Sequence, residues 1–187
     1  EGKIVGAETS AGFISCDYLV NAAGAWAAHI GKMAGIEIPV YPVRGQIIGT
    51  ETLPNILSAC ISTNDCYIAQ KYHGEIIIGS TTEEKEFDVE VTPSAMQSLS
   101  AGAVRALPFL ENVKVKRVWS GLRPGTADEL PILGPVKELE GYLNACGHFR
   151  TGILTSPITG LLISEMILGN PLSYPVDPFL LSEDRFN

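Results

Sequence analysis

The chain of 187 residues is 45% hydrophobic and 18% charged, which is enough apolar material for a substantial core in one large domain or two small ones. Its 13 basic and 21 acidic residues give a net charge of −8, and no basic run could neutralise a phosphate backbone, so nucleic acid is not an expected partner. The longest apolar stretch contains Pro157 and Glu165, and no charged-then-apolar leader opens the chain. We therefore expect no transmembrane segment and no signal peptide, while peripheral membrane contact stays open.

The four cysteines do not form a metal-binding pattern. Cys16, Cys60, Cys66 and Cys146 make no Cys-x-x-Cys pair and have no histidine at ligand spacing. We expect buried, reduced thiols in a cytoplasmic protein and no metal site.

The first part of the chain reads as a hairpin, a buried strand and a helix. Glu1 is not a methionine and leads directly into an alternating segment, so we expect a longer polypeptide whose front portion precedes this chain. Residues 4–7 and 12–15 predict the hairpin, and residues 18–20 predict the buried strand. The small residues that follow allow a cofactor to approach closely before a helix over residues 26–33. Tight packing of the strand against the helix would explain them equally well.

The middle of the chain predicts an antiparallel sheet with one covering helix. Residues 43–48, 66–69 and 75–79 have strand composition. Thr92 as N-cap and Pro93 at the first helical position predict a helix that stops at Pro108 and covers one face of the sheet. A half-exposed strand is expected over residues 113–119, and a loop over residues 128–135.

Residues 142–168 predict a strand, a glycine-rich turn and a helix. Gly147 and Gly152 bracket the turn, Gly169 ends the helix, and a tail follows through residues 177–178. The unpaired N–H groups at the start of the helix would point at the turn, which suits an anion or a cofactor ring. Taken alone, such a turn more often marks an ordinary connection in a domain that mixes strands and helices.

Three side chains could carry substrate chemistry. Arg123, at a strand end beside Pro124, could offer its planar guanidinium to a carboxylate, although a surface ion pair is the commoner role. Arg150 lies inside the glycine-rich turn and has the same alternative. Tyr67 could cover a ring system or close a pocket, although an aromatic residue in a strand more often belongs to the core. The sequence contains no Gly-x-Ser-x-Gly elbow, so it gives little support to nucleophilic hydrolysis.

Together these segments resemble the carboxyl-terminal part of the glycine oxidase and D-amino-acid oxidase family of FAD-dependent oxidoreductases, with glycine oxidase the closest. Four stretches carry the resemblance in the family's order: residues 20–26 (VNAAGAW), 42–46 (PVRGQ), 119–126 (WSGLRPGT) and 147–154 (GHFRTGIL).

The resemblance implies a flavoprotein of α+β class. It implies a mixed or antiparallel substrate-domain sheet covered by helices, plus the carboxyl-terminal strand-turn-helix of an incomplete Rossmann-like FAD-binding domain. Residues 1–40 and 123–187 would belong to FAD binding, and residues 41–122 would form the substrate domain. Arg123 would bind the substrate carboxylate, Tyr67 would line the pocket, and Arg150 would lie where flavin and substrate meet. The implied FAD contacts are Ala23, Gly24, Gly147, His148, Phe149, Arg150, Thr151, Gly152, Ile153 and Leu154.

The sequence departs from the family pattern at two points. Some relatives carry histidine two positions before the pocket tyrosine, where this chain has Asp65, so the substrate preference does not transfer. The family's GxGxxG nucleotide-binding loop is absent from these residues and is expected in the preceding portion.

The expected reaction is oxidation of the C–N bond of a small amino acid or N-substituted glycine, such as glycine, sarcosine or a D-amino acid, with FAD as hydride acceptor. Two alternatives stay open: an FAD-dependent dehydrogenase of a 2-hydroxy acid or amine that passes electrons to a quinone or partner subunit, and a noncatalytic ligand-binding or assembly domain. The expected partner is a small amino acid or amine substrate, and a homo-oligomer or a partner subunit remains open.

Overall fold

The computed structural model describes residues 2–186, so Glu1 and Asn187 lie outside the described residues. It contains two compact units, Glu1–Pro42 with Arg123–Asn187 and Val43–Leu122. The mixture of helices and sheets confirms the predicted α+β class. Within residues 2–186, no helix combines the length and the apolar character needed to cross a membrane.

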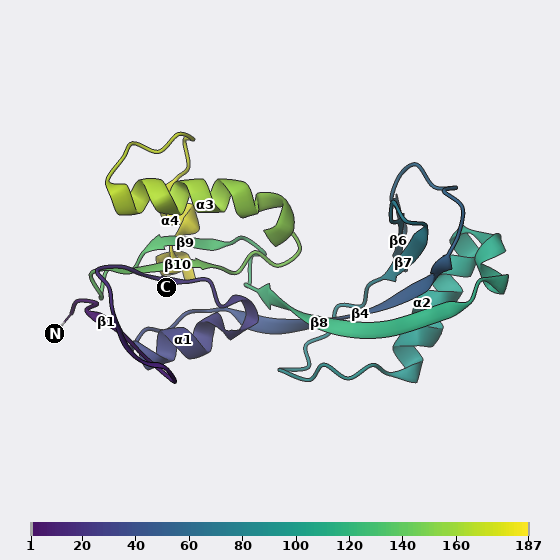
Figure 1. Ribbon diagram of the computed structural model, residues 1–187, viewed down its shortest axis with the longest axis horizontal. Helices are drawn as coiled ribbons and strands as arrows, with labels where there is room; N and C mark the ends of the chain where they lie inside the picture. Colours follow the sequence, from purple (N-terminus) through teal and green to yellow (C-terminus); the bar gives the residue numbers. More distant parts are fainter. Residues whose placement is uncertain (1, 187) are drawn as a thin grey trace. The chain divides into compact units, whose positions relative to one another are not determined.

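The first unit is built on a three-stranded mixed sheet. Its order is β3 (Leu19–Asn21), β10 (Tyr142–Cys146) and β9 (Ile132–Pro135), with β3 parallel and β9 antiparallel to β10. Figure 1 shows α3 (Gly152–Leu168) and α1 (Ala27–Met33) on opposite sides of this sheet. The side chains that alternate along β10 therefore enter two different layers.

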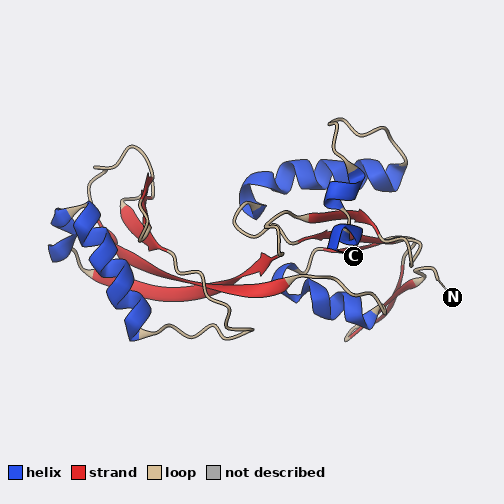
Figure 2. Cartoon of the chain, turned by 180° about the vertical axis from the view of Figure 1, so that it is seen from behind, coloured by secondary structure: helices blue, strands red, loops and turns tan. Residues whose placement is uncertain are grey.

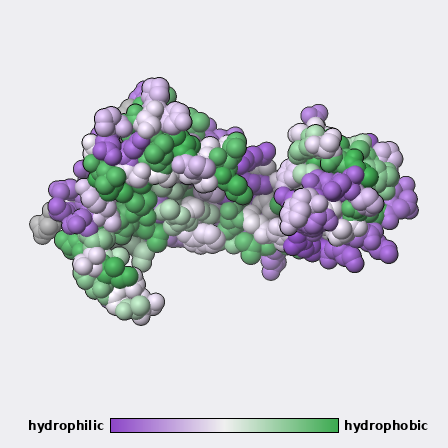
Figure 3. All heavy atoms as spheres, turned by 45° about the horizontal axis from the view of Figure 1, so that its top comes forward, coloured by the Kyte–Doolittle hydropathy of each residue, from purple (hydrophilic) through white to green (hydrophobic). Residues whose placement is uncertain are grey.

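A predicted hairpin precedes this sheet. Strands β1 (Gly6–Thr9) and β2 (Gly12–Ser15) pair antiparallel, which confirms the hairpin, although β1 begins two residues later than expected. The hairpin region exposes Val5, Phe13 and Ile14. Figure 3, which colours the surface by hydropathy, shows green hydrophobic residues among the hydrophilic ones on the face in view.

The second unit holds a five-stranded sheet whose first four strands pair antiparallel, as predicted. The sheet order is β5 (Ile61–Ser62), β6 (Tyr67–Gln70), β7 (Glu75–Gly79), β4 (Tyr41–Thr52) and β8 (Val115–Gly125). Ile68, Ile78 and Ile48 are register partners on neighbouring strands, so they share one face.

Helix α2 (Pro93–Ala106) packs on that isoleucine face, with the short 3₁₀ helix η2 (Pro108–Asn112) after it. Thr92 accepts a hydrogen bond from the Ala95 N–H at 3.4 Å, and Pro93 occupies the first turn, as the sequence predicts. Buried Leu99 joins the isoleucines in one core cluster. Figure 2 shows the helix beside its sheet.

Two sequence predictions were wrong. The expected loop over residues 128–135 contains the four-residue strand β9. Its glycine, Gly134, and the prolines at 131 and 135 predict a loop because both residue types are rare inside strands. Its pairing with β10 and the burial of Ile132 make it a strand. The expected tail beyond residue 177 forms α4 (Pro178–Leu181) and the 3₁₀ helix η3 (Glu183–Phe186). Within η3, Arg185 Nε forms an ion pair with Asp128 Oδ2 at 2.7 Å.

The thiols are free, but their predicted burial is only partly correct. Cys66 and Cys146 are buried, Cys16 is half-buried and Cys60 is exposed. Cys146 lies on β10 among apolar neighbours, and this burial raises the pKa of its thiol to about 12. It therefore stays protonated and is no candidate nucleophile.

Candidate functional site

The candidate site begins where two parallel strands end. Leu19, Val20 and Asn21 of β3 pair in parallel with Tyr142, Leu143 and Asn144 of β10. Parallel strands end at the same edge of a sheet, so the loops that follow them start side by side. The segments predicted to contact FAD, residues 22–24 and 147–154, follow these two strands.

Asn21 fixes the start of the first loop. Its side-chain N–H₂ donates to the Ala27 carbonyl at 2.9 Å and to the Tyr142 hydroxyl at 2.8 Å, and its oxygen accepts from the Ala23 N–H at 3.2 Å. Gly24 has a positive φ of 57°, and an added Cβ there would meet nothing within 4 Å. The loop is therefore held in a tight turn beside open space.

Gly147 is required at the start of the second loop for two reasons. Its φ is 75°, in the left-handed region that favours glycine. A Cβ would also lie 2.9 Å from Thr126 Cγ2 and 3.3 Å from the Ile132 backbone nitrogen. The backbone thus turns directly against buried Thr126.

Hydrogen bonds hold the rest of this loop in a strained turn. Phe149 has a positive φ of 48°, which is unusual for a bulky residue. Its N–H donates to the Pro124 carbonyl at 2.9 Å, and both the N–H and the hydroxyl of Thr151 donate to the His148 carbonyl at 2.9 Å. Because the strain is compensated by fixed contacts, the turn has one defined conformation.

His148 connects the turn to the helix that follows it. One of its ring nitrogens lies 2.9 Å from the hydroxyl of Thr159, which is buried on α3. Burial lowers the pKa of His148 below its ordinary value, so the imidazole is neutral at pH 7. His148 therefore contributes position rather than charge.

The amino-terminal end of α3 is open to solvent. Ile153 is 96% exposed and Leu154 is 83% exposed, although both are apolar. Thr151, at the N-cap, makes no side-chain cap bond, so its hydroxyl leaves the first N–H groups of the helix uncovered. Pro157 is accommodated within the helix, where the Ser156 hydroxyl donates to the Ile153 carbonyl that a residue-157 N–H would otherwise bond.

The predicted arginines flank the same junction. Arg123 precedes Pro124, whose carbonyl accepts the Phe149 N–H, and it is half-buried near the end of β8. Arg150 is exposed, with its guanidinium carbon 5.0 Å from the centre of the Phe149 ring. Two positive charges therefore belong to the two segments joined at this junction.

The structure thus brings most of the predicted site residues together within the first unit. Tyr67 belongs to the second unit, where its ring lies against β7: a Cβ added at Gly79 would be 2.9 Å from the Tyr67 hydroxyl. Its role as a pocket residue stays a prediction, as do the roles of the others. Asp65, where some relatives carry histidine, forms an exposed ion pair with Arg105 at 2.8 Å.

Sequence reasoning missed several residues that build this region. Thr126 and Asn144 are fully buried polar residues at the loop junction and on β10, and Asn144 Oδ1 has no hydrogen-bond partner within residues 2–186. Arg44 belongs to the 42–46 segment, but the sequence pattern assigns it no role of its own. The signal that could have found it is a charged residue inside a strand that also contains Val43, Ile47 and Ile48.

Comparisons with known proteins identify the family of this chain. A family model described as "DAO: FAD dependent oxidoreductase" matches residues 1–166. The chain is 57% identical over 180 residues to hydrogen cyanide synthase subunit HcnC of Pseudomonas aeruginosa, covering 95% of this chain and 43% of that protein. It is 36% identical to glycine oxidase of Pseudomonas putida, covering 90% of this chain and 46% of that protein.

A solved glycine oxidase has the same fold over this region. The crystal structure from Geobacillus kaustophilus matches with a TM-score of 0.87 and 35% identity, covering 94% of this chain and 48% of that one. The identity to HcnC exceeds that to these glycine oxidases, which corrects the expectation that glycine oxidase is closest. The chain spans less than half the length of the curated relatives described here. It belongs to the DAO family of FAD-dependent oxidoreductases.

Proposed function

We propose that the full-length protein oxidises the C–N bond of glycine or a similarly small amino acid or N-substituted glycine. The observation that carries the proposal is the junction at which Pro124, next to Arg123, is hydrogen-bonded to the turn that precedes α3. This junction ties a candidate carboxylate-binding arginine to the candidate cofactor loop. Relatives named glycine oxidase support a small amino acid as the substrate class.

The residues present fit the flavin end of FAD. Gly24 lacks a side chain where an added Cβ would meet only open space, and the exposed start of α3 presents N–H groups and a positive dipole end. The segments that would hold the cofactor are residues 23–24 and 147–154. When bound, the flavin supplies a hydride acceptor, and N–H groups near it would favour negative charge on the ring.

Arg123 would orient the substrate. A guanidinium binds a carboxylate through two parallel hydrogen bonds, which fixes the direction of the α-carbon. Such positioning converts binding energy into rate without requiring a protein nucleophile. The product would be an imine that water hydrolyses after release.

A second candidate has a specific observation in its favour. The 57% identity to a chain named as a subunit of hydrogen cyanide synthase suggests an enzyme that works with partner chains. In that case the electrons from the flavin would pass to a partner or a quinone rather than to oxygen. We propose a cytoplasmic location for either form.

The test uses the full-length protein loaded with FAD. Glycine, sarcosine, D-alanine and D-proline are added without oxygen, and flavin absorbance is followed. We expect bleaching by at least one substrate, and unchanged absorbance with all four would rule the proposal out. Oxygen uptake against dye reduction then separates oxidase from dehydrogenase, and cyanide release tests the activity in the relative's name.

Arg123→Ala tests the substrate arginine. Loss of a charged hydrogen-bond partner should weaken binding by about 2–5 kcal/mol, measured as a higher KM or a weaker affinity for a carboxylate inhibitor. Arg123→Lys should recover only part of the loss because lysine lacks the planar fork. Arg105→Ala, which breaks an exposed ion pair with Asp65, is the matched control. Equal behaviour of Arg123→Ala and Arg105→Ala would remove Arg123 from this role.

A further inference from the structure

Residues 80–92, here called the strap, connect β7 to α2 in the second unit. Most of the strap lies outside regular helix or strand, and residues 84–90 are exposed. It is rich in carboxylates, with five acidic residues between positions 83 and 90: Glu83, Glu84, Glu86, Asp88 and Glu90. A segment of this composition needs specific contacts to keep one position.

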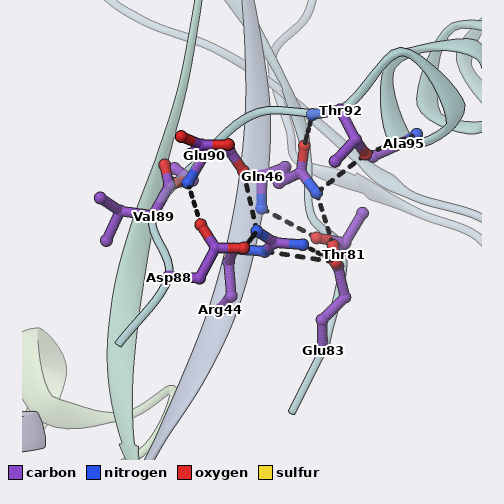
Figure 4. Close-up of polar contacts among 10 residues, drawn as sticks. Arg44, Gln46, Thr81, Glu83, Asp88, Val89, Glu90, Thr92 and Ala95 are labelled. Atoms are coloured by element: carbon purple, nitrogen blue, oxygen red, sulfur yellow. Dashed lines mark hydrogen bonds and ion pairs between the residues drawn. The ribbon is translucent and has the colours of Figure 1, made fainter. Parts of the chain in front are cut away.

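Buried Arg44 of β4 provides those contacts. Arg44 is only 2% exposed. Its guanidinium donates to Glu83 Oε2 at 3.2 and 2.6 Å, to the Asp88 carboxylate, and to the Glu90 carbonyl at 3.0 Å. Figure 4 shows the guanidinium between Glu83 and Asp88. One side chain thus binds the strap at three successive points.

Backbone and amide groups reinforce this latch. The Arg44 N–H donates to the Glu83 carbonyl at 2.8 Å, and the Glu83 N–H donates to the Arg44 carbonyl at 3.0 Å. Gln46 donates to Glu83 Oε1 at 2.7 Å, and its oxygen accepts the Thr92 N–H at 2.8 Å. Both ends of the strap are therefore attached to the same strand.

The latch depends on charge. A buried guanidinium without a partner is costly, and removal of its partners leaves that charge uncompensated. Burial by itself would raise the pKa of Glu83, but hydrogen bonds from Thr81, Arg44 and Gln46 outweigh it and lower the pKa. The carboxylate therefore stays ionised and paired at neutral pH.

The strap begins beside the candidate pocket residue. It leaves the sheet after Gly79, which is the register partner of Tyr67. The Tyr67 ring lies over Gly79, where an added Cβ would be 3.0 Å from ring atoms Cε1 and Cζ. Ile68, Ile78 and Ile48 face α2. Side chains alternate along a strand, so Tyr67, next to Ile68, lies on the other face of the sheet. Ile47 lies on that face too, because both residues are in register with Gly79.

We propose that Arg44 is a positioning residue: by latching the strap, it holds residues 80–83 as a wall beside Tyr67 and so limits the pocket to small substrates. This inference rests on the proposed function and on the role of Tyr67 in it. A loosened wall would bind glycine less tightly and would discriminate less against substrates with a larger side chain.

The experiment uses the full-length enzyme with Asp88→Asn and Glu83→Gln. Each variant weakens one charged contact but leaves Arg44 another carboxylate partner, so the fold is retained. Glu84→Gln, an exposed carboxylate on the same strap, is the matched control. The first measurement is kcat and KM for glycine and D-alanine. We expect a higher KM for glycine with kcat within about twofold, and a kcat/KM ratio of D-alanine to glycine that rises by about fivefold or more.

The second measurement does not depend on activity. Trypsin can cut after exposed Lys85 in the strap, and cleavage follows the population of the released strap. We expect cleavage to accelerate by about tenfold in the latch variants and not in Glu84→Gln.

The outcomes separate the two proposals. Faster cleavage with an unchanged substrate ratio would show a latched strap that is not a pocket wall, which overturns the inference while the proposed function stands. Unchanged cleavage in both latch variants overturns the latch itself. If the unaltered enzyme oxidises none of the four substrates, the proposed function fails and the pocket-wall inference fails with it, whatever the cleavage pattern.

Discussion

Replacement of Gly147 by alanine tests whether the glycine-rich turn has the close packing described above. The substitution acts in two ways at one position. A non-glycine residue at a φ of 75° costs about 1–2 kcal/mol. The new Cβ, 2.9 Å from Thr126 Cγ2, adds overpacking of about 1–3 kcal/mol because the turn lies directly on buried Thr126. We expect Gly147→Ala to destabilise the full-length protein by about 2–5 kcal/mol.

Gly169→Ala separates the two contributions. Gly169 ends α3 with a φ of 67°, and a Cβ there would meet nothing within 4 Å. Only the backbone term of about 1–2 kcal/mol applies to it. Thr126→Ser removes Cγ2 while keeping the hydroxyl that donates to Leu130 at 2.8 Å. Combined with Gly147→Ala, it should recover about 1 kcal/mol or more of the loss.

The assay is urea unfolding of the FAD-free protein followed by circular dichroism, together with the dissociation constant of FAD measured by flavin fluorescence. Gly147→Ala should lower the unfolding midpoint more than Gly169→Ala and should also weaken FAD binding, whereas Gly169→Ala should leave FAD binding unchanged. If the two glycine variants lose equal stability, or if Thr126→Ser gives no recovery, the turn is not packed as described.

Two further predictions concern other parts of the chain. Hydrogen bonding and charge from Arg185 lower the pKa of Asp128 to about 2, so this contact stabilises the fold above the unfolded pKa of about 4 and is lost as pH falls from about 4 toward 2. Asp128→Asn should lower the free energy of unfolding by only about 1 kcal/mol at pH 7, because solvent screens a partly exposed ion pair. The difference in urea midpoint between this variant and the parent protein should narrow below about pH 4. Gly79→Ala should displace the flexible end of Tyr67 at a cost below about 2 kcal/mol, yet raise KM for glycine in initial-rate assays.

Each of these has a defined contrary result. A difference between Asp128→Asn and the parent protein that stays constant from pH 7 to pH 3 would mean that the Arg185 contact does not stabilise the fold. For the second, Gly121→Ala on β8 is the control because a Cβ there meets nothing within 4 Å. Equal KM values for Gly79→Ala and Gly121→Ala would place Tyr67 outside the pocket.

The sequence alone determined the elements whose cause is local. Thr92 and Pro93 start α2 because a cap oxygen and a fixed φ act within one turn of helix. Gly147 and Gly169 mark turns because positive φ excludes most other residues. The resemblance to a family of flavoproteins came from the order of four segments along the chain, which is also a property of the sequence.

Tertiary structure decided whatever depends on partners distant along the chain. Strand β9 exists because β10 pairs with it, although its own Gly134 and Pro135 argue against a strand. The Arg44 latch joins residues about forty positions apart, and Asp128 meets Arg185 across an even longer separation. Hydrogen bonds and charge pairs of this kind have no local signature, since their energy appears only once folding has brought both partners out of water.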